Sequence, residues 1–230
     1  MKNNQYQTNY ELGKEVQKRL IEFGIENPVN HQLIKQWSNE EHLDSLAKKL
    51  IPFLENLGIY SNDEDSSHTA NRLVDYWCNQ LFYGLDYNYF PQINPMPNEF
   101  TYHNPLIAEN IKFTSTCEHH LVPIHGVAII AYKPDSILVG LNKLNSVLDF
   151  FAHRPQLQER LVKQIFISLQ YLLKTENIAI LIKARHDCIC SNGVCDYSSS
   201  HSSFEFGGVF DSDLSFKQHL LNKLDRIEAF

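Results

Sequence analysis

The sequence predicts an α+β fold. Apolar residues recur at helical spacing in the first third of the chain and again near its end. Runs at 100–116, 124–133 and 178–185 instead have the short apolar or alternating pattern of strands. The order is helices first, then strands with two helices between them, and then a final helix, which is typical of the α+β class.

Length and composition favour one sizeable domain with a helical extension. The chain has 230 residues, of which 43% are hydrophobic, so a packed core is expected. We place the helical extension at 1–67 and the main domain at 68–230. No apolar run is long enough to span a membrane, and the polar start lacks a signal-peptide pattern, so a cytoplasmic location is expected. The formal charge of −7 disfavours nucleic acid as a partner.

The first third of the chain contains three helical patterns. One lies within 1–38, a second covers 40–58, and a third covers 68–83 after a solvated acidic loop at 61–67. The apolar positions of the first are Leu12, Val16, Leu20 and Phe23. Those of the second are Leu43, Leu46, Leu50, Phe53, Leu54 and Leu57. Stripes of this kind predict a core or a subunit contact.

Two helices are expected between the strands. Asn142 to Phe151 shows the first pattern. Arg154 and Pro155 are expected to begin the second, because proline fits the first turn of a helix. Gln158 and Glu159 would then lie in that first turn, where polar groups can face a site while the helix stays anchored.

The end of the chain combines a loop and a helix. Residues 189–203 are rich in Ser, Gly, Asn and Cys, which predicts a loop or an irregular hairpin. The pattern over 213–229 predicts a last helix, with Ser212 or Asp213 as its N-cap.

A cluster of possible metal ligands follows the first predicted strand. Cys117 and His120 are separated by two residues, so one turn can direct sulfur and imidazole nitrogen at the same point, which zinc accepts. A third ligand is available at Cys188, after another predicted strand. Three ligands with one open position are typical of catalytic zinc. His119 and His186 would remain free for proton transfer, which predicts a zinc hydrolase.

The cysteines support a metal site. The chain has five of them, an odd number, and most lie near histidines or near one another. This pattern favours metal binding over a disulfide framework. An alternative is a closed structural zinc site, completed by Cys190 or Cys195. Cys78 has no assigned role.

Several motifs in register resemble the GTP cyclohydrolase I family. They are Thr114 to Leu121 (TSTCEHHL), Gly140 to Leu144 (GLNKL), Arg154 to Leu161 (RPQLQERL), His186 to Cys188 (HDC) and Gly207 to Phe210 (GGVF). Together they are far more specific than any one of them. The resemblance implies the tunnelling fold, in which antiparallel sheets of several subunits join into a barrel. It also implies a homodecamer of two stacked pentameric rings, with active sites between subunits.

The resemblance also assigns roles to individual residues. It implies Cys117, His120 and Cys188 as zinc ligands, His119 and His186 as proton-transfer groups, Gln158 and Glu159 as the purine recognition pair, and Lys143 and Arg72 as phosphate-binding residues. Taken singly, a buried thiol, a core histidine or an ordinary acidic residue in a first turn would explain several of them. The matching framework favours the functional roles.

The implied reaction is hydrolytic opening of the guanine imidazole ring of GTP, with release of formate and formation of 7,8-dihydroneopterin triphosphate. Ser146 and Asn192 depart from the pattern, because the family carries arginine at both positions. Arginine–phosphate pairs are stronger than hydrogen bonds from neutral groups, so an altered site with weaker binding of the triphosphate is expected. Arg154, Arg160, Lys183 or Arg185 could compensate.

Three hypotheses follow from this departure. The first is a working GTP cyclohydrolase I with a rearranged phosphate site. The second is a relative that opens a different purine, with fewer phosphates, in a specialised pathway. The third is a zinc-stabilised, non-catalytic assembly that binds a purine or a partner.

Overall fold

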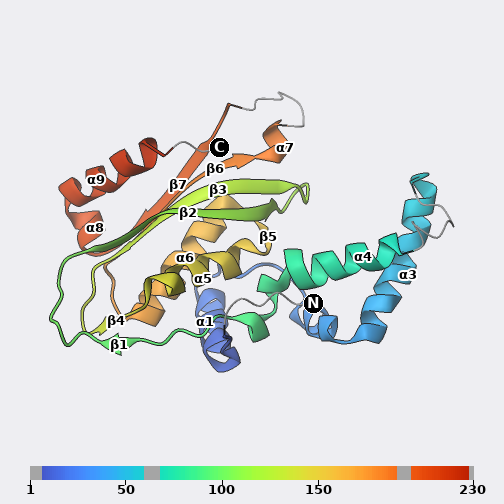
Figure 1. Cartoon of the computed structure of the whole chain (residues 1–230), viewed down its shortest axis with the longest axis horizontal. Helices are drawn as coiled ribbons and strands as arrows, with labels where there is room; N and C mark the ends of the chain where they lie inside the picture. Colours follow the sequence, from blue (N-terminus) through green and yellow to red (C-terminus); the bar gives the residue numbers. More distant parts are fainter. Residues whose placement is uncertain (1–6, 60–67, 191–197, 228–230) are drawn as a thin grey trace.

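A five-stranded sheet lies at the centre of the protein (Figure 1). The computed structural model describes residues 7–59, 68–190 and 198–227. In sheet order the strands are β5 (Pro155–Gln156), β2 (Leu106–Cys117), β3 (Pro123–Tyr132), β6 (Ile178–His186) and β7 (His201–Phe206). All neighbours are antiparallel except β2 and β5, which are parallel. A separate pair is formed by β1 (Met96–Pro97) and β4 (Ile137–Leu138).

The helices precede, join and follow these strands. They are α1 (Tyr10–Glu22), α2 (His31–Ile34), α3 (Glu40–Asn56), α4 (Thr69–Tyr76), α5 (Leu141–Ala152), α6 (Gln158–Leu173), α7 (Asp187–Cys190), α8 (Val209–Ser212) and α9 (Leu214–Asp225). The shorter turns are η1 (Lys35–Ser38), the π-helical η2 (Trp77–Leu81), η3 (Tyr83–Leu85) and η4 (Tyr87–Tyr89).

Side-chain caps explain where several helices begin. Asn9, Asn30, Asn39 and Asp213 each precede a helix and accept a backbone N–H of its first turn. Such a cap stabilises a helix by about 1 kcal/mol. The alternative in which Asp213 caps the last helix is therefore confirmed.

Both faces of the sheet are covered by helices. Helices α5 and α6 lie on one face, and α8 and α9 lie on the other (Figure 1). The alternation of β6 shows this directly, because Ile180 and Ile182 belong to the first core and Leu181 belongs to the second. The prediction of an α+β fold is confirmed.

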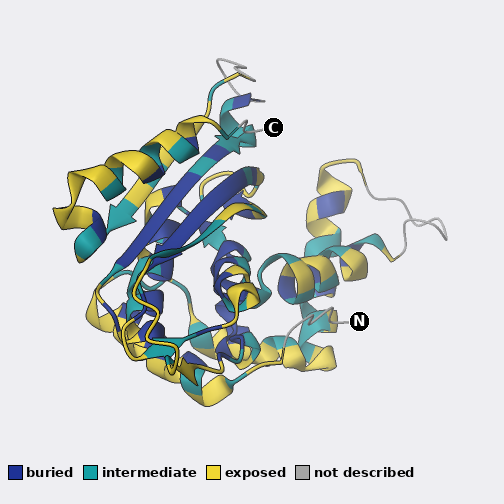
Figure 2. Cartoon of the chain, turned by 60° about the vertical axis from the view of Figure 1, so that its left-hand side comes forward, coloured by how far each residue is buried: buried dark blue, intermediate teal, exposed yellow. Residues whose placement is uncertain are grey.

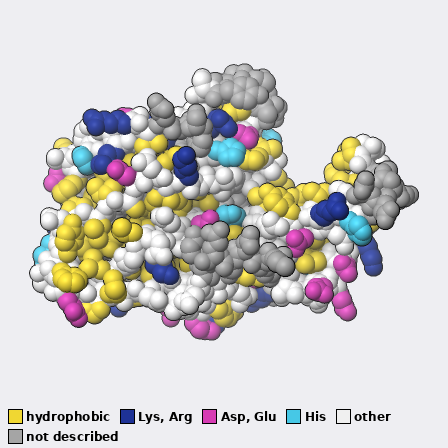
Figure 3. Space-filling view, in the orientation of Figure 1, with side chains coloured by type: hydrophobic (Ala, Val, Ile, Leu, Met, Phe, Trp, Pro, Cys, Tyr) yellow, Lys and Arg dark blue, Asp and Glu magenta, His cyan; other side chains and the backbone are white. Residues whose placement is uncertain are grey.

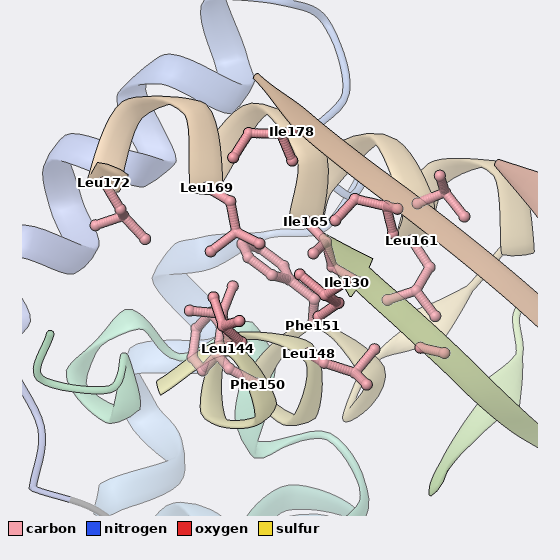
Figure 4. Packing of buried hydrophobic residues seen from close by; sticks show 14 of the residues in the cluster. Ile130, Leu144, Leu148, Phe150, Phe151, Leu161, Ile165, Leu169, Leu172 and Ile178 are labelled. Atoms are coloured by element: carbon pink, nitrogen blue, oxygen red, sulfur yellow. The ribbon is translucent and has the colours of Figure 1, made fainter. Parts of the chain in front are cut away.

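The larger core fills the space between the sheet and α5 and α6. In Figure 4, Phe151 and Leu148 of α5 meet Ile165 and Leu161 of α6 beside Ile130 of β3. Each of these side chains is at most 2% exposed. Full burial of a side chain of this size contributes about 1.5–3 kcal/mol, so this core anchors the helix that carries Gln158.

The N-terminal segment divides between two cores. Val16 and Leu20 of α1 are fully buried in the larger core, whereas α3 and α4 have a small core of their own around Leu54 and Val74. Figure 2 shows the buried strands at the centre of the body and the α3–α4 pair at its side. The boundary between residues 67 and 68 stays a prediction, and the acidic loop at 61–67 lies outside the described residues.

The predicted start of the helix at Arg154 is wrong. Pro155 and Gln156 form a short strand that pairs in parallel with Thr116 and Cys117, and α6 begins only at Gln158. A residue before proline is disfavoured in the helical region, which opposes a helix that begins at Arg154. This correction matters for the site, because it attaches the start of α6 to the strand that ends at Cys117.

Other boundaries also differ from expectation. Residues 201–203, in the segment predicted as a loop or an irregular hairpin, begin β7 and pair antiparallel with β6, as the hairpin alternative expects, and α7 occupies the start of the same segment. The first long strand begins at Leu106 rather than at residue 100, and α4 ends at Tyr76. Within the described residues, no helix is long and apolar enough to cross a membrane.

Several residues of the predicted apolar stripes are exposed rather than buried. Phe23 is 51% exposed, Phe53 60% and Leu57 56%. They point away from the single chain and do not contribute to its core.

Candidate functional site

A tight turn between β2 and β3 brings Cys117 and His120 together. The N–H of Leu121 donates to the carbonyl of Cys117 at 2.8 Å, and the N–H of Cys117 donates to the carbonyl of Val122 at 2.8 Å. Leu121 has a φ of +54°, which is rare for a leucine and is accepted here to close the turn. As a result, Sγ of Cys117 lies 3.8 Å from Nδ1 of His120.

Cys188 completes a cluster of three possible ligands. It lies on α7, directly after β6, and β6 pairs with β3 so that His186 is opposite Ile124. The ligand atoms of Cys117, His120 and Cys188 all lie within 4.8 Å of one another.

This cluster fits zinc. Zinc bonds of about 2.3 Å to sulfur and about 2.0–2.1 Å to nitrogen in a tetrahedron separate the two ligand atoms by about 3.5–3.6 Å. The 3.8 Å between Cys117 and His120 is close to that value. Burial and the neighbouring Cys117 raise the pKa of the Cys188 thiol, so metal binding must displace thiol protons.

The closed-site alternative gains no support from the described residues. Cys190 is buried and does not belong to the cluster. Cys195 and Asn192 lie outside the described residues.

A cavity of about 430 Å³ lies beside the cluster. Of the predicted site residues, Cys117, Cys188, His119, His186, Gln158 and Glu159 line it. Glu159 is exposed, and Gln158 is only 5% exposed. The start of α6 therefore brings a free carboxylate and a buried amide to the same wall as the three-ligand cluster.

Gln158 is held by the protein itself. Its Nε2 donates to the carbonyl of His201 at 3.0 Å and to Oγ of Ser203 at 2.9 Å. A carbonyl only accepts, so this contact fixes the orientation of the amide, and Oε1 accepts from Nε2 of His186 at 2.8 Å. The neutral imidazole of His186 therefore carries its proton on Nε2 and has its lone pair on Nδ1.

The surroundings of His186 favour its neutral form. Burial lowers the pKa of His186, the neighbouring His201 lowers it further, and Glu159 acts in the opposite direction. The rings of His186 and His201 meet edge to face, with centroids 5.5 Å apart. A neutral imidazole near pH 7 can accept a proton.

The turn that carries Cys117 and His120, here called the ligand turn, is tied to α6 by an ion pair and to β5 by a backbone hydrogen bond. The carboxylate of Glu118 forms an ion pair with the guanidinium of Arg160, and the N–H of Glu118 donates to the carbonyl of Gln156 at 3.0 Å. Glu118 thus supports the position of the ligand turn, and Arg160 is already engaged.

The cavity wall also contains residues that were not predicted as site residues. Gln156 and His201 both line the cavity. Gln156 belongs to β5, where a helix was predicted, and His201 begins β7, in the segment predicted as a loop or an irregular hairpin. Pairing of these strands with β2 and β6 is a long-range contact, and it leaves no local signal in the sequence.

The predicted phosphate residues lie elsewhere in the single chain. Lys143 is on α5 and Arg72 is on α4, and neither lines the cavity. Ser146 is 1% exposed, and its hydroxyl donates to the carbonyl of Asn142 at 2.9 Å. At this position α5 therefore turns a small residue towards the core.

The basic residues suggested as substitutes are occupied. Arg154 is fully buried, and its guanidinium pairs with Glu26 at 3.1 Å and lies 4.6 Å from the centroid of the Phe151 ring. Nζ of Lys183 donates to the carbonyl of Ile227 at 3.0 Å. Nε of Arg185 lies 3.7 Å from a carboxylate oxygen of Asp187.

Comparison with known proteins points to one family. The family model of GTP cyclohydrolase I matches residues 46–225. Proteins named GTP cyclohydrolase 1 from Shewanella sp. (strain W3-18-1) and Wigglesworthia glossinidia brevipalpis are each 37% identical, over 93% and 90% of this chain and 98% and 94% of their own lengths. The protein of that name from Buchnera aphidicola subsp. Schizaphis graminum is 40% identical over 87% of this chain and 91% of its own length. The α+β sheet with helices on both faces is consistent with the tunnelling fold of this family. On these matches, the chain belongs to the GTP cyclohydrolase I family of enzymes.

Proposed function

We propose that this protein is a zinc-dependent GTP cyclohydrolase I. It would open the imidazole ring of the guanine of GTP by hydrolysis, release formate and form 7,8-dihydroneopterin triphosphate. One observation carries the proposal: the cluster of Cys117, His120 and Cys188 lies at a cavity that is also lined by three histidines, among them His119 and His186, and by the carboxylate of Glu159. The names of the relatives point to the same activity.

Cys117, His120 and Cys188 would hold the zinc ion. The chemistry that zinc supplies in a site with three protein ligands is Lewis-acid activation of water. His186 would accept and return protons at Nδ1, because its Nε2–H is committed to Gln158. His119 lines the same cavity and would serve as the second proton-transfer group.

Glu159 would recognise the purine base. Guanine presents two adjacent N–H donors on its Watson–Crick edge, and a carboxylate accepts both with good geometry. Glu159 is exposed on the cavity wall and is free to do so. Gln158 would contribute by positioning His186, because its own amide is used by His186, His201 and Ser203.

The triphosphate would be bound across a subunit boundary. Lys143 and Arg72 lie outside the cavity of the single chain, so their proposed contact with phosphate requires a neighbouring subunit. Hydrophobic side chains gather on the left half of the face in Figure 3, and Phe100 and Leu214 are 85% and 79% exposed. Exposed apolar surface of this kind supports assembly, for which we propose a decamer of two pentamers.

The second candidate function of the same site is opening of a purine with fewer phosphates. The observation that favours it is the charge of the cavity. Among the described residues that line it there are three histidines and one glutamate, but no lysine or arginine. The third hypothesis, a non-catalytic assembly, is less well supported because His119 and His186 both reach the cavity.

The test is turnover of GTP by the zinc-loaded protein, with products followed by mass spectrometry. We expect formate and 7,8-dihydroneopterin triphosphate, and loss of both in Cys117→Ala and His119→Ala. An intact, zinc-loaded protein that leaves GTP unchanged would refute the proposal. Turnover of GMP or guanosine under the same conditions would then establish the second function.

A further inference from the structure

A buried polar network joins the N-terminal segment to the candidate metal site. Its members are four polar side chains that are each at most 4% exposed: Asn27, Arg154, Gln156 and Gln164. They come from the loop after α1, the bend after α5, strand β5 and helix α6. Burying polar groups is unfavourable unless they are hydrogen-bonded, so a network of this kind constrains the positions of its members strongly.

Asn27 makes three contacts with the stretch that leads into the cavity wall. Its Nδ2 donates to the carbonyl of Pro155 at 2.8 Å. Its Oδ1 accepts from Nε2 of Gln164 at 2.9 Å and from Nη1 of Arg154 at 3.3 Å. One side chain of the N-terminal segment therefore holds both the backbone of β5 and the first turns of α6.

Gln164 passes this constraint to Gln156. Nε2 of Gln164 also donates to the carbonyl of Ile25 at 2.8 Å, and its Oε1 accepts from Nε2 of Gln156 at 2.7 Å. The same Nε2 of Gln156 donates to the carbonyl of Phe151 at 2.9 Å. The side chain of Gln156 is thus fixed between α5 and α6.

Gln156 in turn contacts the ligand turn. It is the strand partner of Cys117, and its carbonyl accepts from the N–H of Glu118 at 3.0 Å. Two residues further on, Gln158 holds His186. The backbone of β5 therefore lies between the N-terminal segment on one side and a candidate zinc ligand on the other.

We propose that the segment Ile25–Asn27 is a positioning element of the metal centre, with Asn27 and Gln164 as positioning residues. They act through β5, which sets the place of Cys117 relative to His120 and Cys188. The inference rests on the proposed zinc site. It assigns a role in the active site to a segment that lies outside the part matched by the family model, residues 46–225.

Co²⁺ is a suitable probe, because its absorption bands report thiolate coordination and ligand geometry independently of turnover. We would load the full-length protein with Co²⁺ and compare it with Asn27→Ala and Gln164→Met. The first variant removes all three side-chain contacts of Asn27. The second keeps the side-chain volume and removes only the polar link, so folding should be retained.

Val16→Ala is the matched control. Val16 is fully buried in the same N-terminal segment and packs in the larger core, but it has no part in the network. It should lower the melting temperature without changing the Co²⁺ spectrum or affinity. Asn27→Ala and Gln164→Met should shift the bands and weaken Co²⁺ binding about tenfold, the lower end of the effect of losing an outer partner of a metal ligand.

Each outcome decides the proposal. Folded Asn27→Ala and Gln164→Met proteins with the spectrum and affinity of the unmodified chain would overturn it. Absence of thiolate-to-cobalt bands in the unmodified chain, or an equal change in Val16→Ala, would overturn it as well. If the two network variants alone change the bands but the unmodified protein does not turn over GTP, the positioning role is supported and the proposed reaction fails.

Discussion

Gln158 could have either of two roles, binding the purine or positioning His186, and a substitution at Gln158 distinguishes them. In the structure, its Oε1 accepts from Nε2 of His186 at 2.8 Å, while its Nε2 is used by His201 and Ser203. Gln158→Met keeps the approximate volume and removes these hydrogen bonds. We expect a loss of kcat with little change in KM, because Glu159 still offers its carboxylate to the base.

The size of the effect follows from one lost contact. A neutral hydrogen bond contributes about 1 kcal/mol, and one to a charged group contributes about 1.5–3 kcal/mol. Since about 1.4 kcal/mol corresponds to a tenfold change in rate, kcat should fall about fivefold if His186 stays neutral. It should fall about 10- to 100-fold if His186 becomes protonated in the transition state.

Steady-state kinetics with GTP on the zinc-loaded enzyme would measure this. Ser203→Ala is the control, because it removes one hydrogen bond of Gln158 to β7 and leaves the contact with His186 in place. It should change kcat much less than Gln158→Met does. A rise in KM with unchanged kcat in Gln158→Met would refute the reasoning and favour direct purine binding.

Three further predictions concern stability and metal binding. Arg154→Met should lower the free energy of unfolding by about 3–5 kcal/mol, because it leaves the buried carboxylate of Glu26 unpaired. Adding Glu26→Gln to Arg154→Met should restore part of the lost free energy of unfolding. Strictly additive losses of the two substitutions in denaturant titrations would contradict a coupled pair. Burial lowers the pKa of His31 below its usual value of 6.5, so the unfolded chain binds the proton more tightly than the folded protein does. The stability that this histidine contributes is therefore present above about pH 6.5 and is lost as the pH falls through the pKa of the folded state. In His31→Gln, the melting temperature should depend less on pH below about pH 6.5 than in the unmodified protein. An unchanged pH dependence would show that His31 is not its source. Burial and Cys117 raise the pKa of the Cys188 thiol in the metal-free protein, so Co²⁺ affinity should rise from about pH 6 to about pH 8, as calorimetry can test; a flat profile would argue against thiol ligands.

Local patterns predicted most of the fold correctly. The alternation of apolar residues predicted the strands that became β3 and β6, and Asp213 was a predicted cap of the last helix. These features depend on neighbours within a few residues, which the sequence displays directly. Strand β5 was missed, and the start of β7 was predicted only as part of a loop or an irregular hairpin, because their pairing partners lie far away in the chain.

The candidate site was predictable in composition but not in arrangement. The spacing of Cys117 and His120 predicted a pair of ligands on one turn, and they lie 3.8 Å apart. The commitment of Gln158 to His186 was not predictable, since the two residues are 28 positions apart. Arg154 was considered as a substitute for phosphate-binding arginines, yet it is fully buried against Glu26 and three aromatic rings.

By itself, the sequence determined the α+β class, the family and the local pair of candidate ligands, because each depends on residue types at short, fixed spacings. The tertiary structure decided which polar side chains remain available for chemistry. Glu159 is free on the cavity wall, whereas Gln158, Arg154 and Arg160 are taken up by partners within the protein. It also brought Asn27 to within hydrogen-bonding distance of Gln164, 137 residues away. Such contacts depend on how whole elements pack together, and no local pattern in the chain specifies them.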